Sequence, residues 1–220
     1  MRGLDRPPAL VIFDCDGVLV DSERPMHEEL RALLAEHGLD LSLAACLDAF
    51  MGLSIDALLH SARDMGADLP ADFRSRLYAR VHARLARGTN LIPGVADLIA
   101  RLRAAGIPMC VASNGSEAKM ELMLEQHGLW TQFRDHCYSA QTLGVAKPDP
   151  GLLQTALHGS GVSAAQAVVI EDSVTGIESA RRAGVTCLHF APAERAVEGV
   201  LRFETMAEIG DVILCNGRGR

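Results

Sequence analysis

Long apolar segments and clusters of basic residues are both absent from this sequence. None of its apolar runs approaches the roughly 18 residues that a membrane-spanning helix requires. The 220 residues carry a formal charge of −7, and Lys and Arg are spread along the chain instead of forming a basic stripe, which argues against nucleic-acid binding. With 49% hydrophobic and 22% charged residues, the composition predicts a soluble globular protein that engages neither membranes nor nucleic acids.

Motifs of paired cysteines and zinc-binding histidines are missing as well. There is no C-x-x-C and no H-E-x-x-H, and residues 1–8 contain no hydrophobic signal segment. We therefore expect a cytoplasmic protein with free thiols and no zinc site. The cysteines expected to be free are Cys15, Cys46, Cys110, Cys137, Cys187 and Cys215. Neither G-x-x-x-x-G-K-[ST] nor G-x-G-x-x-G occurs, so nucleoside triphosphate and dinucleotide binding lose their usual support.

Four apolar runs have the pattern of strands that are buried on both faces. They lack alternation of apolar and polar residues, which is typical of parallel strands covered by helices. Helical patterns separate them, so the sequence predicts an α/β fold with a Rossmann-like, doubly wound parallel sheet. The expected strands are Leu10–Phe13, Pro108–Ala112, Ala167–Ile170 and Thr186–Phe190, and the expected helices are Val95–Ala105, Glu117–His127, Pro150–His158 and Gly176–Ala183. Asp149 and Pro150 fit an N-cap and a first helical position.

Residues from about 23 to 88 break this alternation and show helical periodicity alone. The expected helices are Met26–Glu36, Ser42–Phe50, Ile55–Met65 and Asp72–Ala86. We interpret residues 21–89 as an all-helical cap domain inserted after the first strand. The α/β catalytic core is then discontinuous, with residues 1–20 and 90–220, and the two linkers would form a hinge.

Polar residues follow three of the predicted strands. In an open parallel sheet, ligands bind outside the carboxyl ends of the strands. The candidates at this edge are Asp14 and Asp16 after the first strand, Ser113 and Asn114 after the second, Glu171 and Asp172 after the third, and Lys147 just before a helix. We therefore expect these side chains to form one site.

The four carboxylates of this candidate site need a counter-charge. Two charges 4 Å apart repel by about 1 kcal/mol in water and by about 4 kcal/mol at an effective dielectric of 20. Mg²⁺, which prefers oxygen ligands, would relieve the repulsion. Asp14, Asp172 and Glu171 are the candidate ligands. A phosphoryl group would accept a hydrogen bond from the Ser113 hydroxyl. The backbone N–H groups near Asn114 lie at the start of a predicted helix, whose positive end also favours phosphate.

Four segments carry a family resemblance. They are FDCDGVLVDSE (13–23), VASNG (111–115), VAKPDP (145–150) and VIEDSVTGIESARRAG (169–184). In order and approximate spacing they resemble the four motifs of the haloacid dehalogenase superfamily, in its phosphatase branch with a helical cap and β-phosphoglucomutase-like relatives. Residues 107–123, IPMCVASNGSEAKMELM, are similar to bacterial sugar-phosphate phosphatases of the 6-phosphogluconate phosphatase kind.

This resemblance implies a mechanism. Asp14 would attack phosphorus and form an aspartyl-phosphate, while Asp16 would protonate the leaving oxygen and then activate water. Mg²⁺ would be held by Asp14, the Asp16 backbone carbonyl and Asp172, with Glu171 in support. Ser113, Asn114 and Lys147 would bind the phosphoryl oxygens. The implied substrate is a small phosphorylated metabolite, a sugar or sugar-acid phosphate, and we expect a monomer, with a dimer as the alternative.

A phosphosugar mutase is the main alternative. In β-phosphoglucomutase-like chains, the sequence of one cap loop resembles K-G-V-S-R, and its Lys and Arg hold a second phosphate. The corresponding stretch here is Met51-Gly52-Leu53-Ser54-Ile55, with no basic residue. The cap histidine of those mutases aligns with Met26, although a shift by one would align it with His27. The sequence therefore favours a phosphatase.

A dehalogenase and a phospho-receiver module fit the sequence less well than a phosphatase. A dehalogenase needs neither the acid at Asp16 nor the metal cluster with Asp172, and a phospho-receiver module would have no use for the helical insertion.

The insertion's arginines could contact an acidic substrate, but a solvated helix face is the favoured interpretation. They are Arg63, Arg74, Arg76, Arg84 and Arg87.

Overall fold

The structure is a computed structural model that describes residues 4, 6–53 and 55–214. The chain divides into two compact units, one formed by Met1–Val20 with Leu91–Arg220 and the other by Asp21–Asn90. Short strands lie at the two crossings between them, β2 (Val20–Asp21) and β3 (Asn90–Leu91), and they pair as a two-stranded sheet.

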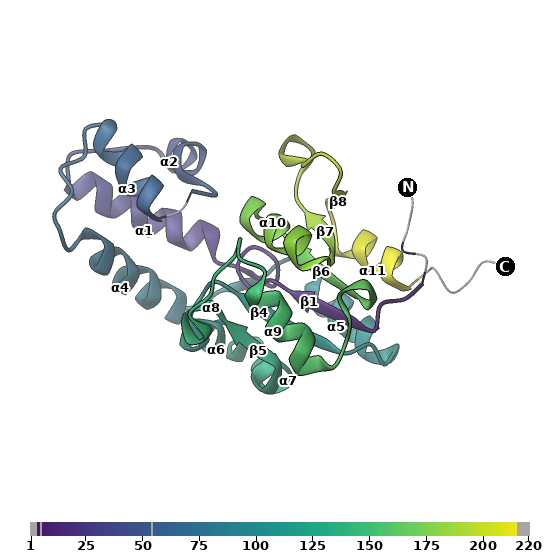
Figure 1. The fold of residues 1–220 in the computed structure, drawn as a ribbon. Coiled ribbons are helices and arrows are strands. Elements are labelled where there is room, and N and C mark those ends of the chain that lie inside the picture. The colour runs from purple at the N-terminus through teal and green to yellow at the C-terminus, as the bar shows by residue number, and fades with distance from the viewer. Residues whose placement is uncertain (1–3, 5, 54, 215–220) are drawn as a thin grey trace. The chain divides into compact units, whose positions relative to one another are not determined.

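The first unit is built on a six-stranded parallel sheet with the order β5-β4-β1-β6-β7-β8. This confirms the predicted doubly wound fold. The strands are labelled in Figure 1. The strands are β1 (Leu10–Phe13), β4 (Met109–Ser113), β5 (Cys137–Ser139), β6 (Ala167–Glu171), β7 (Thr186–Phe190) and β8 (Leu201–Phe203). The sequence did not predict β5 and β8, because these three-residue edge strands are only partly buried and have no apolar run.

Helices cover both faces of this sheet. The chain runs from β1 through β4 to β5 on one side, then returns to β6 and continues to β8 on the other. Right-handed crossovers therefore place the helices of the two halves on opposite faces. The helices are α5 (Val95–Ala104), α6 (Glu117–Glu125), α7 (Trp130–Phe133), α8 (Ala140–Leu143), α9 (Gly151–Ser160), α10 (Val174–Ala183) and α11 (Met206–Leu214), with 3-10 turns at Arg134–His136, Ala164–Gln166 and Ala193–Arg195.

Strand β1 shows why the core strands lack alternation. All four of its residues are buried. Leu10 and Ile12 pack in a cluster with Leu152, Leu153 and other residues of α9 and α10. On the other face the Phe13 ring meets the Phe133 ring of α7 edge to face, with centroids 6.2 Å apart. Both faces of the strand are therefore apolar, which fixes the position of the residues that follow it.

The start of α9 differs by one residue from the prediction. The helix begins at Gly151 with Pro150 as its N-cap residue, and the Asp149 side chain still contributes, because its Oδ1 accepts a hydrogen bond from the Gly151 N–H at 2.8 Å. Asp149 is held in turn by Ser179 of α10, whose hydroxyl donates to the Asp149 carbonyl at 2.8 Å. These bonds fix the segment that carries Lys147.

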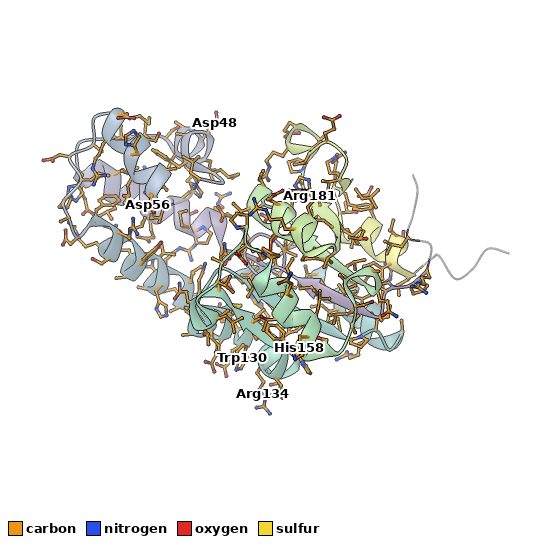
Figure 2. All side chains as sticks on the ribbon, in the orientation of Figure 1. Asp48, Asp56, Trp130, Arg134, His158 and Arg181 are labelled. Carbon is orange, nitrogen blue, oxygen red and sulfur yellow. The ribbon has the colours of Figure 1, made fainter. Side chains whose placement is uncertain are left out.

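The second unit is helical. Its helices are α1 (Glu23–Glu36), α2 (Leu43–Phe50), α3 (Ile55–Asp64) and α4 (Phe73–Ala86). Buried leucines of α1 and α4 form its core, and the rings of His37 and Phe73 meet edge to face at 5.6 Å. Four of the five arginines named above form ion pairs within this unit: Arg74 with Asp56, Arg76 with Glu36, Arg84 with Glu28 and Arg87 with Glu29. Asp56 is labelled on α3 in Figure 2.

Five of the six cysteines are described, and all five are free thiols, as predicted. Burial raises the pKa of each of them. Cys215 lies outside the described residues.

Within the described part of the chain, no single helix is both long and apolar enough to cross a membrane. The helices Leu43–Phe50 and Ile55–Asp64 satisfy the length and composition criteria only as a pair, and they are bent by 120° relative to each other.

Candidate active site

The predicted site residues lie at the carboxyl edge of the sheet, around β1. The chain leaves β1 toward one side of the sheet and leaves β6 toward the other, so the loops after these neighbouring strands diverge. Such a switch point opens a crevice between the two loops. Asp14 follows β1, Glu171 ends β6 and Ser113 ends the other neighbour of β1, strand β4.

Lys147 joins the two sides of this crevice. Its Nζ donates to Asp14 Oδ1 at 2.6 Å and also pairs with Glu171 Oε1. The three side chains are almost completely buried, with exposed fractions of 2% for Lys147, 11% for Asp14 and 1% for Glu171. Buried charges are costly unless they are paired, so the lysine is needed by both carboxylates.

The ionisation of the buried pair follows from this geometry. Burial raises the pKa of Asp14 to about 7, although the Lys147 ammonium opposes the shift. Burial alone would lower the pKa of Lys147, but the Asp14 and Glu171 carboxylates outweigh it and raise that pKa above its usual value. Lys147 therefore stays a cation, while Asp14 needs further positive charge to be fully ionised at neutral pH.

Glu171 is held by the start of α10 as well as by Lys147. Its Oε2 accepts hydrogen bonds from the Ser173 N–H at 3.1 Å and from the Ser173 hydroxyl at 2.9 Å. The same hydroxyl accepts a hydrogen bond from the Gly176 N–H at 3.1 Å and so caps the helix. Both carboxylate oxygens of Glu171 thus have hydrogen-bond donors, which fixes the orientation of this side chain.

Gly176 provides the space for this carboxylate. A Cβ added at Gly176 would lie 1.9 Å from Glu171 Cδ, and Glu171 cannot move without leaving Lys147 and Ser173. We expect Gly176→Ala to lower the free energy of unfolding by about 1–3 kcal/mol in a urea titration, because the buried carboxylate is overpacked.

The matched control is Gly210→Ala, at another helix glycine. There the nearest atom to an added Cβ is Nη1 of Arg101 at 2.8 Å, at the end of a flexible side chain. Gly210→Ala should keep or slightly raise the stability, because Ala is the better helix former. Equal stability of Gly176→Ala and the original chain would contradict the tight packing around Glu171.

A second group of side chains surrounds Gly115, between β4 and α6. The Ser113 hydroxyl accepts a hydrogen bond from the Gly115 N–H at 3.0 Å, and the Ser139 hydroxyl donates to the Gly115 carbonyl at 2.8 Å. A Cβ at Gly115 would lie 3.3 Å from Ser113 Oγ and 3.5 Å from Asp16 Oδ2. Asp16 and Ser113 therefore face the same small space, in which a ligand could meet both.

Lys119 of α6 completes this group. Its Nζ donates to Asp16 Oδ1 at 2.6 Å, and the two side chains are 28% and 21% exposed. The sequence-based interpretation did not single out Lys119, although the stretch 107–123 that carries part of the resemblance includes it. The composition could have drawn attention to Lys119, because the chain has only two lysines, Lys119 and Lys147.

Asn114 has a role that the sequence did not predict. Its side-chain Nδ2 donates to the Lys147 carbonyl at 3.2 Å, and its Oδ1 accepts from the Lys147 N–H at 2.9 Å. The amide thus fixes the backbone of Lys147 across 33 residues of sequence. Only the Asn114 backbone, next to the start of α6, remains as the phosphate contact that we predicted.

Asp14, Glu171 and Asp172 form an acidic cluster in which one oxygen of each lies within 4.8 Å of the others. Gly17 adjoins it with φ +76°, and a Cβ there would lie 2.1 Å from Asp172 Oδ2. The glycine thus allows both the turn after Asp16 and the close approach of Asp172. These oxygen donors could hold a hard divalent cation.

A cavity of about 320 Å³ adjoins Asp172. Gly17, Phe190, Arg195 and Glu204 also line it. His189, a buried residue of β7, has a hydrogen bond between its ring and the Asp172 backbone. Burial lowers the pKa of His189, and this hydrogen bond opposes the shift.

Comparison with known proteins gives consistent results. A family model described as haloacid dehalogenase-like hydrolase matches residues 8–184. A phosphoglycolate phosphatase from Rhodospirillum rubrum is 33% identical over 192 residues, which cover 81% of this chain and 77% of the relative. A 6-phosphogluconate phosphatase from Escherichia coli is 29% identical over 182 residues, covering 82% and 81%.

A solved structure shares the fold over nearly its whole length. It is a haloacid dehalogenase family hydrolase from Deinococcus radiodurans with bound phosphate and sodium, 32% identical to this chain. The superposition has a TM-score of 0.81 and covers 96% of this chain and 97% of the other.

Proposed function

Because the chain belongs to the haloacid dehalogenase-like hydrolase family, as the motif resemblance implied, we propose that it is a Mg²⁺-dependent phosphatase of small phosphomonoesters. The substrates would be sugar or sugar-acid phosphates, hydrolysed through an aspartyl-phosphate. One observation carries this proposal above the others. Asp14 is buried beside Lys147 and belongs to the acidic cluster, while Asp16, two residues on, faces Ser113 and Gly115.

In the first half of the reaction, an Asp14 carboxylate oxygen attacks phosphorus. The new bond joins Asp14 to the phosphoryl group, and the bond from phosphorus to the ester oxygen breaks. Asp16 gives its proton to that leaving oxygen, which departs as an alcohol. In the second half, water attacks the aspartyl-phosphate, Asp16 accepts a proton from the water, and Asp14 is released with inorganic phosphate.

The acidic cluster fits Mg²⁺ as the cofactor, and the raised pKa of Asp14 is consistent with a missing positive charge. Asp14 and Asp172 would be its side-chain ligands, with the Asp16 backbone carbonyl as a third. Both oxygens of Glu171 already accept hydrogen bonds from Lys147 and Ser173, so Glu171 would support the ligands without binding the ion itself. Bound Mg²⁺ would neutralise charge that develops on the phosphoryl oxygens.

The remaining residues would position the phosphoryl group. The Ser113 hydroxyl and the backbone N–H groups at Asn114 and Gly115 would donate to its oxygens, close to the start of α6. Lys147 would place its charge beside Asp14 and the incoming phosphate. Asn114 holds the Lys147 backbone through two hydrogen bonds, so the lysine is positioned before substrate binds.

Two features of the helical unit favour a phosphatase over a phosphosugar mutase. The loop after α2 has Met51 and Leu53, both exposed, where a second phosphate would need basic residues; Ser54 lies outside the described residues. His27 is completely buried, and its ring nitrogen Nδ1 donates to the Glu23 carbonyl at 2.8 Å, so its ring faces the interior of the helical unit. We also propose that this unit is the cap implied by the motifs.

A phosphate-release assay on a panel of sugar and sugar-acid phosphates tests the proposal. We expect turnover with Mg²⁺, a fall of at least about 10³-fold after chelation, and full recovery when Mg²⁺ is restored, since the cation offsets several kcal/mol of charge in the transition state. Turnover that chelation leaves unchanged would contradict the mechanism.

The same assay separates the alternatives. It includes β-glucose 1-phosphate with its bisphosphate activator. Isomerisation faster than phosphate release would establish the mutase instead. Stable phosphorylation from a small donor, without hydrolysis, would establish a phospho-receiver.

A further inference from the structure

The two lysines of this chain lie at one site, although basic residues are otherwise arginines. Of the 21 basic residues, 19 are arginines, and the two exceptions are Lys119 and Lys147. Lys147 is 2% exposed and pairs with two buried carboxylates. Lys119 is 28% exposed and pairs with Asp16. The two lysines therefore serve different sides of the site, one the buried nucleophile and the other the acid.

The path of the Lys119 side chain is set by Gly115. Lys119 lies in the first turn of α6, whose N-cap Ser116 accepts a hydrogen bond from the Lys119 N–H at 3.2 Å. Its Cδ would lie 3.7 Å from a Cβ at Gly115, so it passes directly beside the glycine toward Asp16. The ammonium thus lies on the same side of the site as the Asp16 carboxylate.

The distance to Asp16 places Lys119 beside the leaving group. In the proposed reaction Asp16 contacts the leaving oxygen through a hydrogen bond of about 2.8 Å. Since Lys119 Nζ is 2.6 Å from Asp16 Oδ1, the ammonium comes within roughly 5–7 Å of that oxygen. When the carbon bonded to the phosphorylated carbon is a carboxylate, its oxygens lie about 3 Å from the ester oxygen, and a carboxylate directed toward Lys119 comes within ion-pair range, about 4 Å, of the ammonium.

The charge balance of the site points the same way. With Asp16 protonated, as the first half of the proposed reaction requires, Lys147 and one proposed Mg²⁺ balance the three remaining carboxylates, Asp14, Glu171 and Asp172. The Lys119 ammonium beside Asp16 is then a positive charge in excess. It would attract a second anionic group on the leaving group.

We propose that Lys119 binds a carboxylate of the leaving group. The enzyme is then selective for phosphomonoesters in which the carbon next to the phosphorylated carbon is a carboxylate. This inference rests on the proposed phosphatase function and adds a specificity-determining residue to it. Lys119 makes its contact from the core unit, through the same ammonium that pairs with Asp16.

A matched pair of esters tests this role. Phosphoglycolate carries the carboxylate, and 2-hydroxyethyl phosphate carries a neutral hydroxyl in its place. Loss of the ion pair with Asp16 should slow both esters, but we expect Lys119→Met to lower kcat/KM for phosphoglycolate about 10–100-fold more than kcat/KM for the neutral ester, with the difference mainly in KM. Lys119→Arg keeps the charge and should retain most of the preference for phosphoglycolate.

The control variant is Arg195→Met, which removes the cation that lines the cavity beside Asp172. It should leave the ratio of the two kcat/KM values unchanged.

The inference is overturned if Lys119→Met slows both esters equally, because the lysine would then only position Asp16. It is also overturned if Arg195→Met removes the preference or if the original enzyme has none. Failure of the original enzyme to release phosphate from any ester with Mg²⁺ would instead reject the phosphatase function and this inference with it.

Discussion

Asp14→Asn is expected to abolish turnover, with kcat at least about 10⁴-fold below that of the original enzyme. The amide has nearly the same size and can occupy the same buried position after β1, but it is a poor nucleophile toward phosphorus. Because no covalent intermediate can form, the loss should appear in kcat and persist at saturating substrate and Mg²⁺. Phosphate release under these conditions measures it.

The intermediate itself gives a second measurement. Rapid acid quenching of the original enzyme during turnover should yield a protein with one added phosphoryl group, seen by mass spectrometry, and peptide mapping should assign it to residues 10–20. Asp14→Asn should show none. Asp97→Asn makes the same chemical change on the exposed surface of α5 and should keep both the activity and the adduct. Turnover by Asp14→Asn within tenfold of the original enzyme would disprove nucleophilic catalysis by Asp14.

Lys147→Met is expected to remove both activity and stability. Methionine has a similar length, but Asp14 and Glu171 would then be buried without their shared cation. Breaking a buried ion pair by removing one partner typically costs 3–5 kcal/mol, so we expect the free energy of unfolding to fall by about this amount in urea titrations with a chelator present. Phosphate release should become undetectable, since the charge beside the phosphoryl group is also lost.

The matched control is Arg181→Met on α10. Arg181 is 71% exposed and pairs with Glu178; it is labelled in Figure 2. Removing this cation should leave the unfolding curve and the activity unchanged, because water replaces the lost partner. If Lys147→Met were as stable as the original protein, the carboxylates of the buried pair would not depend on Lys147.

The two lysines stabilise three of the four carboxylates of the site. Lys147 stabilises Asp14 and Glu171 from within the protein, and Lys119 stabilises Asp16 from the helix that follows β4. Ser173 and Asn114 hold Glu171 and the Lys147 backbone, respectively, so neither depends on a ligand for its orientation. The site is thus arranged before substrate binds, which is the condition for electrostatic stabilisation of a transition state.

The local pattern of the sequence determined the central part of the fold and the members of the site. Strands β1, β4, β6 and β7 could be predicted because both of their faces are covered, which requires continuous apolar runs. Their carboxyl ends meet at one edge, so Asp14, Ser113 and Glu171 could be assigned to one site before any distance was known. The edge strands β5 and β8 were missed because three-residue, partly buried strands leave no comparable pattern. The helix α11 was also missed, although its buried residues Met206, Ile209 and Ile213 have helical spacing.

Only the tertiary structure decided which of these groups touch. Lys119 and Asp16 are 103 residues apart, and Lys147 and Asp14 are 133 apart. Sequence spacing carries no information on such contacts, since they arise from the order of the strands and the crossovers between them. The space left by Gly176 and Gly17, and the use of the Asn114 amide on Lys147, likewise depend on packing between distant segments. Local propensity selects the elements, whereas close packing in three dimensions sets the distances on which the chemistry depends.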